Sequence, residues 1–123
     1  VRTLPDPPHI HAFLQIDKLA ITVDERIVIL DTKDIIYIGT SDGRTVISTT
    51  KQKYQVSETL VTFEKKLQRS SIVRVHRAYL INLNKIAEIE PWFNSTYNLI
   101  LQDGEKVPVS RTYTKALKQM LGF

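Results

Sequence analysis

Residues 73–82 read VRVHRAYLIN, a run in which two arginines and a histidine fall where an apolar, strand-like alternation ends. No Asp or Glu lies within five residues of Arg74, His76 or Arg77. Burying an unpaired charge is costly, so we expect at least some of these groups to face a ligand or water. The planar donor fork of a guanidinium suits phosphate or the acceptor edge of guanine. The run therefore gives a first indication of nucleic-acid binding.

The charge of the chain is unevenly distributed around this run. Residues 1–43 hold four Lys or Arg against seven Asp or Glu, whereas residues 44–123 hold thirteen against six. A basic surface over the second part of the chain fits a polyanionic partner, although an ordinary solvated basic surface would give the same counts.

Size and composition limit the class of protein. A chain of 123 residues with 42% hydrophobic residues forms one domain with a modest core. It contains no cysteine, which excludes disulfides, thiol catalysis and most structural zinc sites. No apolar run approaches the roughly 18 residues of a membrane span, and no signal peptide opens the chain. We expect a cytoplasmic protein, and because residue 1 is Val we expect a fragment of a longer one.

Most of the chain has the period of β-strands. Residues 1–12 are proline-rich at their start and predict a linker or frayed end, and residues 13–123 predict the domain. Turns are expected at 24–25, 41–43, 94–95 and 103–104. Strands are predicted at 13–16, 20–23, 26–30, 35–38, 45–49, 72–75, 86–90, 97–101 and 106–109.

Two segments have helical spacing instead. The first is predicted over residues 57–68, with Ser57 as its N-cap. The second follows Ser110 or Thr112, and its apolar stripe comprises Tyr113, Leu117, Met120 and Leu121. The sequence thus predicts a mostly β, or β-rich α+β, fold with one or two short helices.

Other kinds of site find little support. No strand–helix unit carries a glycine-rich phosphate loop, and no serine lies beside a suitable His and Asp. His9 and His11 are far in sequence from His76, so we expect no metal site, no cofactor and no enzymatic activity. Trp92 and Phe93 follow Pro91 at a strand end. They could stack on single-stranded bases, but an aromatic pair of this kind favours the edge of a core.

Three motifs in order resemble the LytTR family of bacterial DNA-binding domains, the output domains of LytR/AlgR-type response regulators. They are residues 73–83 (VRVHRAYLINL), 86–94 (IAEIEPWFN) and 108–113 (PVSRTY). Residues 34–38 (DIIYI) and the Asp42-Gly43 turn extend the resemblance upstream, so that it covers roughly residues 15–121.

The resemblance implies an elongated stack of small antiparallel β-sheets that reads the major groove of duplex DNA through loops. It assigns base contacts to Arg44, Arg77 and Arg111, which all lie at strand ends or turns. The family commonly carries Glu at the position of Gly39 and an aromatic residue or His at that of Arg44, which leaves the base preference of the first loop open. Contacts to the DNA backbone are expected from His76, Lys51, Lys53, Ser110, Tyr113 and Lys115.

The expected function is sequence-specific binding of double-stranded DNA at promoter direct repeats, within a two-component transcriptional regulator. A receiver or sensor domain is expected upstream, with the isolated domain monomeric and two copies paired on DNA. The alternative is an RNA-binding or protein-interaction β module that uses the same basic face. An RNA reader should expose stacked aromatic residues, and a protein-binding module would not need arginines on three separate turns.

Overall fold

The computed structural model describes residues 17–123, so the linker predicted at 1–12 and the strand predicted at 13–16 lie outside the described residues. The described strands are β1 (Lys18–Val23), β2 (Arg26–Asp31), β3 (Ile35–Ser41), β4 (Arg44–Thr49), β5 (Lys53–Val56), β6 (Ile72–His76), β7 (Tyr79–Asn82), β8 (Ile86–Pro91), β9 (Tyr97–Leu101) and β10 (Lys106–Val109). The helices are α2 (Leu60–Lys66) and α3 (Arg111–Leu121), with 3-10 turns η1 (Thr32–Asp34), η2 (Leu83–Lys85) and η3 (Phe93–Ser95).

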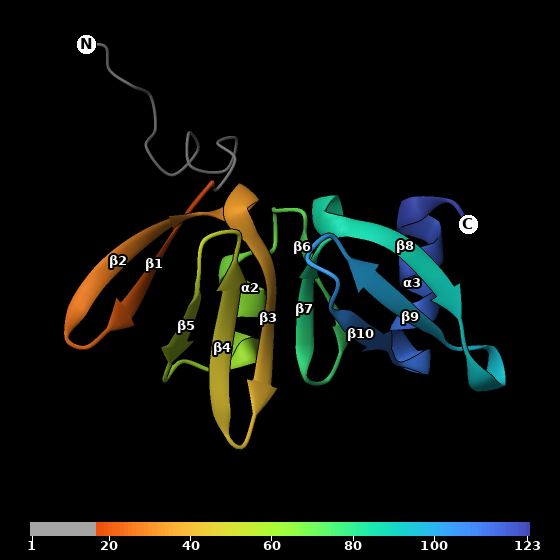
Figure 1. Cartoon of the computed structure of the whole chain (residues 1–123), viewed down its shortest axis with the longest axis horizontal. Helices are drawn as coiled ribbons and strands as arrows, with labels where there is room; N and C mark the ends of the chain where they lie inside the picture. Colours follow the sequence, from red (N-terminus) through yellow and green to blue (C-terminus); the bar gives the residue numbers. More distant parts are fainter. Residues whose placement is uncertain (1–16) are drawn as a thin grey trace, which may run out of the picture.

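These strands form three small sheets that follow one another along the long axis of the molecule (Figure 1). The first is the β1–β2 hairpin, the second has the order β5-β4-β3-β7-β6, and the third has the order β10-β9-β8. Every strand pair is antiparallel. The predicted fold class, an elongated stack of small antiparallel sheets with two short helices, is confirmed.

Two strands were not predicted, for opposite reasons. β7 is the strand between β3 and β6, and Leu80 and Ile81 are buried on its opposite faces. A strand buried on both faces loses the apolar–polar alternation by which strands are recognised. β5 is an edge strand with the sequence KYQV, in which Lys53 and Gln55 are polar and exposed and the apolar signal is short.

The first helix is shorter than predicted, and Ser57 is not its N-cap. It begins at Leu60, because the Thr59 side chain accepts a hydrogen bond from the Thr62 backbone N–H and so caps the first turn. The second helix begins after Ser110, one of the two predicted caps. Its apolar stripe is only partly buried, since Leu117 is covered whereas Met120 is exposed.

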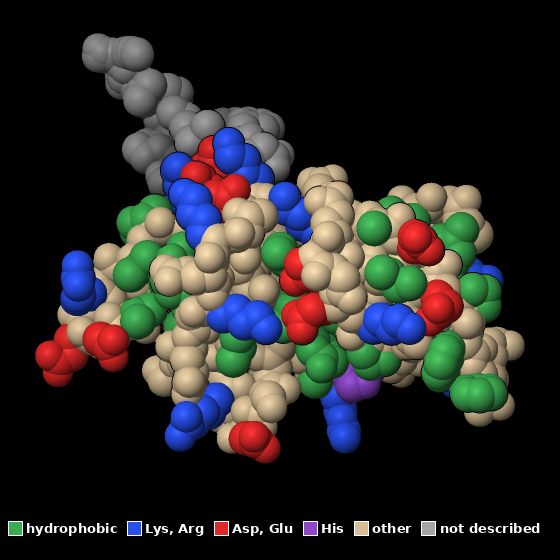
Figure 2. All heavy atoms as spheres, viewed as in Figure 1, with side chains coloured by type: hydrophobic (Ala, Val, Ile, Leu, Met, Phe, Trp, Pro, Cys, Tyr) green, Lys and Arg blue, Asp and Glu red, His purple; other side chains and the backbone are tan. Residues whose placement is uncertain are grey.

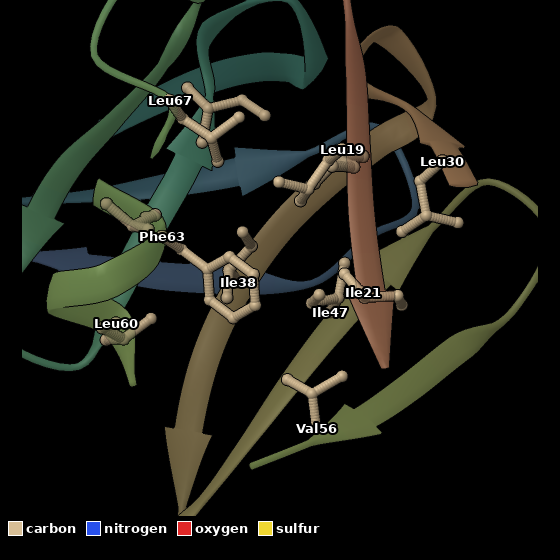
Figure 3. Packing of buried hydrophobic residues seen from close by; sticks show 12 residues of the cluster. Leu19, Ile21, Leu30, Ile38, Ile47, Val56, Leu60, Phe63 and Leu67 are labelled. Atoms are coloured by element: carbon tan, nitrogen blue, oxygen red, sulfur yellow. The ribbon is translucent and has the colours of Figure 1, made fainter. Parts of the chain in front are cut away.

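β3 and β7 separate two hydrophobic clusters. Ile35, Ile38 and Leu80 face the first cluster, which α2 and the β1–β2 hairpin cover. Figure 3 shows Phe63 of α2 lying against Ile38 in this cluster. Ile81 faces the second cluster, which the third sheet and α3 complete. The two central strands therefore hold the outer sheets on either side of one shared framework.

A buried amide fixes the position of β7 in this framework. The Asn82 side chain is fully buried, and its amide nitrogen donates to the Ile35 carbonyl at 2.8 Å. Its oxygen accepts from the Ser71 hydroxyl at 2.8 Å and from the Asn84 backbone N–H at 3.0 Å. An apolar strand can slip in register without exposing a polar face, so a satisfied buried amide specifies the pairing.

Candidate nucleic-acid interface

Four connections meet along one edge of the molecule, here called the loop edge. It comprises the β3–β4 turn, the β6–β7 turn, the β8–β9 loop and the start of α3, all at the lower border of Figure 1. β7 pairs antiparallel with both β3 and β6, so β3 and β6 run in the same direction and end together. The backbone N–H of Ser110 donates to the Val75 carbonyl at 3.0 Å, which places the start of α3 beside the end of β6.

The β3–β4 turn places Arg44 at this edge. Asp42 and Gly43 both have positive φ, 54° and 75°, the conformation that a two-residue hairpin turn requires. Arg44 is exposed beside Gln55 on β5. With its oxygen facing Arg44, the Gln55 amide accepts hydrogen bonds from the guanidinium at 2.9 and 3.3 Å.

The β6–β7 turn carries Arg77 and is braced from below by Arg74. The Arg74 guanidinium donates to the His76 carbonyl at 2.9 Å, to the Arg77 carbonyl at 2.6 Å and to Glu64 at 2.7 Å. Its side chain is only 13% exposed. Arg74 thus has a carboxylate partner that is distant in sequence, because Glu64 reaches it from α2. Arg77 itself has its backbone held and its side chain exposed.

Further contacts hold the same turn. The backbone N–H of Ala78 donates to Nδ1 of His76 at 3.0 Å, and that of Thr40 donates to the Ala78 carbonyl at 3.0 Å. Burial of the imidazole, together with the positive charges of Arg77 and Arg74, holds the pKa of His76 below its ordinary value. His76 is thus placed at the loop edge, but half-buried within the turn.

Gly39, where the family commonly has Glu, lies under the ring of Tyr79. A Cβ at this position would come within 2.9 Å of two Tyr79 ring atoms, well inside van der Waals contact. The Tyr79 ring also packs on His76, with centroids 5.6 Å apart. Glycine at position 39 therefore leaves room for the Tyr79 ring, which packs beside the β6–β7 turn that carries Arg77.

Arg111 opens α3 and is tied to the β8–β9 loop. Its guanidinium donates to the Asn94 carbonyl at 3.4 Å. A hollow of about 560 Å³ is lined by Asn94, Ser95, Arg111, Thr114, Lys115 and Lys118, with no acidic side chain among them. Lys115 is exposed on this helix. Arg44, Arg77 and Arg111 thus lie at three connections of the loop edge, here called the arginine row, and Lys115 lies one turn further along α3.

Ser110 and Tyr113 also lie at the start of α3, but with structural contacts. The Ser110 carbonyl accepts from the Tyr113 N–H and from the Thr114 hydroxyl, each at 3.0 Å. Tyr113 is half-buried and packs against the second hydrophobic cluster. A phosphate contact is open to Ser110 through its hydroxyl, which makes no capping hydrogen bond within the helix.

Lys51 is not brought together with the other predicted contacts, whereas Lys53 lines one hollow with Arg44. Lys51 lies in the β4–β5 connection, at the end of β4 opposite Arg44, and lines a small hollow with Asp31 and Asp34. Lys53 pairs with Glu105 across an Nζ–Oε2 distance of 3.8 Å. Figure 2 shows basic side chains projecting along the lower border with acidic side chains beside some of them, and a mixed acidic and basic group at the opposite border.

Sequence reasoning missed two contributors to this edge. The role of Arg74 was hidden because its partner Glu64 lies ten residues away, on another element. Trp92 and Phe93 were expected at a core edge, and that interpretation was wrong, since both side chains are exposed. Among residues 17–123, no cluster of three metal-ligating side chains occurs and no helix is long and apolar enough to cross a membrane.

Comparison with known proteins agrees with this geometry. The chain is 60% identical to the sensory transduction protein LytT of Bacillus subtilis over 85% of its length, and 41% identical to the transcriptional regulatory protein LytR of Staphylococcus aureus over the same share. It spans 43% of each of these curated relatives. A solved LytTr DNA-binding domain from Bacillus cereus superimposes with a TM-score of 0.76 at 27% identity, covering 87% of this chain and 98% of that one. The family model for the LytTr DNA-binding domain matches residues 25–122. The chain therefore belongs to the LytTR family of DNA-binding domains.

Proposed function

We propose that this domain reads the major groove of duplex DNA with Arg44, Arg77 and Arg111, as the output domain of a bacterial response regulator. The observation that carries the proposal is the braced β6–β7 turn. Arg74 holds the carbonyls of His76 and Arg77, so the Arg77 side chain projects from a backbone already fixed. Binding from a preorganised turn loses less conformational entropy.

The strand order of the second sheet allows an estimate of how far apart Arg44 and Arg77 would contact the DNA. Arg44 opens β4, and Arg77 lies in the turn between β6 and β7, so two to three interstrand steps, roughly 10–14 Å, separate their positions in the sheet. Bases along one strand rise by about 3.4 Å, so Arg44 and Arg77 would contact bases about three to four pairs apart. Arg111 lies beyond them, which gives an elongated footprint along one face of the duplex.

The flanking contacts are proposed to be electrostatic. Lys115, the Ser110 hydroxyl, Tyr113 and His76 lie beside the arginines and would meet phosphates. Lys51 lies away from this row, and Lys53, which lines one hollow with Arg44, already has Glu105 as a partner. We therefore expect the first group to dominate the contacts to the DNA backbone.

The proposed reader can be tested by selection from a random duplex library. The wild-type domain should enrich one motif and bind that duplex far more tightly than a shuffled duplex or the single-stranded RNA of the same sequence. No enrichment, or tighter binding of the RNA, would reject the proposal in favour of an RNA-binding or protein-interaction module.

The whole protein would join this domain to an upstream receiver or sensor domain and act in the cytoplasm. The relatives are more than twice as long as the matched region, which leaves room for such a domain. We propose that the isolated domain is a monomer and that two copies bind direct repeats separated by whole helical turns, about 10 bp each. Inserting about half a turn between the repeats should abolish cooperative binding by the full-length protein; cooperativity that persists would refute pairing on DNA.

A further inference from the structure

The β8–β9 loop presents two exposed aromatic side chains beside the loop edge. Trp92 is 51% exposed and Phe93 is 74% exposed. Their rings meet edge to face, with centroids 5.3 Å apart. Single exposed apolar residues are common on protein surfaces, but an adjacent aromatic pair forms a patch, and such patches mark contact surfaces.

The loop that carries the pair is held in one conformation. The Trp92 N–H donates to the Thr96 carbonyl at 2.8 Å, and the Thr96 N–H and hydroxyl donate to the Phe93 carbonyl at 3.1 and 2.6 Å. Asn94 and Ser95 have φ values of 55° and 61°, in the left-handed region that Asn tolerates and Ser rarely adopts. Backbone strain in a closed loop is consistent with a functional role for the side chains that it displays.

The charges around the loop select the partner. The neighbouring hollow is lined by Arg111, Lys115 and Lys118 and by no acidic side chain. A second copy of the chain packed through the same surface would bring the same positive charges against it. A polyanion is complementary to it, and the Asn94 carbonyl already accepts a hydrogen bond from Arg111. The aromatic pair thus directly precedes Asn94, the residue that the third arginine contacts.

We propose that Trp92 and Phe93 are a fourth duplex-DNA contact, in which Phe93 packs on deoxyribose rings and base edges beyond Arg111. This inference rests on the proposed function and adds an apolar contact to a row of cationic ones. An apolar contact releases no counterions, so it contributes to affinity without contributing to the salt dependence of binding.

Trp92 is the only tryptophan of the chain, so its fluorescence reports directly on this loop. Adding the selected duplex to the wild-type domain should change the Trp92 emission and protect it from acrylamide quenching. Emission and quenching that stay unchanged at saturating DNA would overturn the proposal. A change that depends on protein concentration without DNA would also overturn it, in favour of self-association.

Substitution provides the second measurement. Phe93→Ala should weaken binding about fivefold, the factor that about 1 kcal/mol of lost apolar burial produces, with the slope of log affinity against log salt unchanged. Ile27→Ala is the matched control, because Ile27 is 72% exposed on the β1–β2 hairpin, which lies at the opposite end of the molecule from the β8–β9 loop (Figure 1). Equal affinities of Phe93→Ala and wild type would refute the aromatic contact alone. A wild-type domain that binds no duplex would instead refute the proposed function.

Discussion

The β3–β4 and β6–β7 turns both present an arginine at the loop edge, but they are held in different ways. The first depends on backbone conformation, with Asp42 and Gly43 at positive φ. The second depends on side chains, because Arg74 donates to two carbonyls of the turn and to Glu64. A backbone turn sets the direction of a hairpin, whereas side-chain bonds from below also fix where its tip lies. Arg77 should therefore be the better-positioned reader.

The largest expected effect is the loss of specific binding on replacing Arg77 by alanine. If Arg77 makes a bidentate contact to guanine, the variant should lose about 1–3 kcal/mol of binding free energy for the selected duplex. Arg111→Ala should behave similarly. Arg44→Ala should cost less, because its turn lacks the brace. Titrations of the three variants by fluorescence anisotropy would rank them.

A ranking in which Arg44→Ala costs as much as Arg77→Ala would break the comparison between the two turns. The thermal midpoint of each variant serves as the control, because both side chains are exposed and their removal should leave stability unchanged.

Loss of the Arg74 hydrogen bonds that hold the β6–β7 turn should produce the next largest effect. In Arg74→Lys, the ammonium can still reach Glu64, but it lacks the planar fork that bonds both carbonyls. We expect a loss of about 1–2 kcal/mol in the free energy of unfolding, together with weaker binding of the selected duplex. Chemical denaturation and DNA titration of the same variant would measure both.

A double-mutant cycle tests whether the brace acts through Arg77. Arg74→Lys should weaken binding in the wild-type background and have little further effect in Arg77→Ala, because the group that it positions is then absent. Additive losses from the two substitutions would show that Arg74 does not work by positioning Arg77.

A smaller effect should separate Lys115 from Lys53. Lys115→Ala should weaken binding to selected and shuffled duplexes alike and reduce the salt slope by about one unit. Lys53→Ala should leave the slope unchanged, because Lys53 is already paired with Glu105. Measuring affinity over a range of salt concentrations would decide; a reduced slope for Lys53→Ala would extend the interface beyond the loop edge.

The smallest effect concerns pH and the His76 imidazole in the braced turn. Its pKa is lowered in the folded state by burial and by Arg77 and Arg74, so the unfolded chain binds the proton at higher pH. The stabilising contribution of neutral His76 is therefore present above the ordinary histidine pKa and is lost as the pH falls through the folded value. Protonation of Nδ1 would also remove the hydrogen bond from the Ala78 N–H.

Wild type should accordingly lose stability relative to His76→Gln on acidification, as denaturation at several pH values would show. A difference between the two proteins that does not vary with pH would mean that His76 is not linked to folding.

Much of the fold was predictable because its strands keep a local signature. The Asp42-Gly43 turn and the alternation in β9 and β10 are read directly from neighbouring residues. β7 was missed because Leu80 is buried on one face and Ile81 on the other, so the strand has no apolar–polar alternation. Burial on both faces follows from its position inside the sheet, which the local sequence does not show. The start of α2 was predicted wrongly because Ser57 and Thr59 could each have capped the helix, and the sequence alone does not show that Thr59 does.

The site was less predictable, because what organises it is not local. Arg74 and Glu64 meet only when α2 packs on β6. Arg111 meets Asn94 only when α3 follows β10 beside the β8–β9 loop. The cationic residues are visible in the sequence, but which of them project and which act as supports depends on contacts between separate elements.

The position of β7 between β3 and β6 has a consequence for the order of folding. The β3–β4 hairpin closes locally, whereas Tyr37 finds its partner Ile81 only far later in the chain, after α2 and β6 have been made. Pairings of such sequence separation form slowly, because a long loop must close first. Until β7 is inserted, the Arg44 hairpin has no fixed spacing to Arg77 or Arg111. The ability to recognise a DNA sequence would then be acquired in one late step. Chains that lack β7 would carry the cationic side chains without the fixed spacing between them that recognition requires.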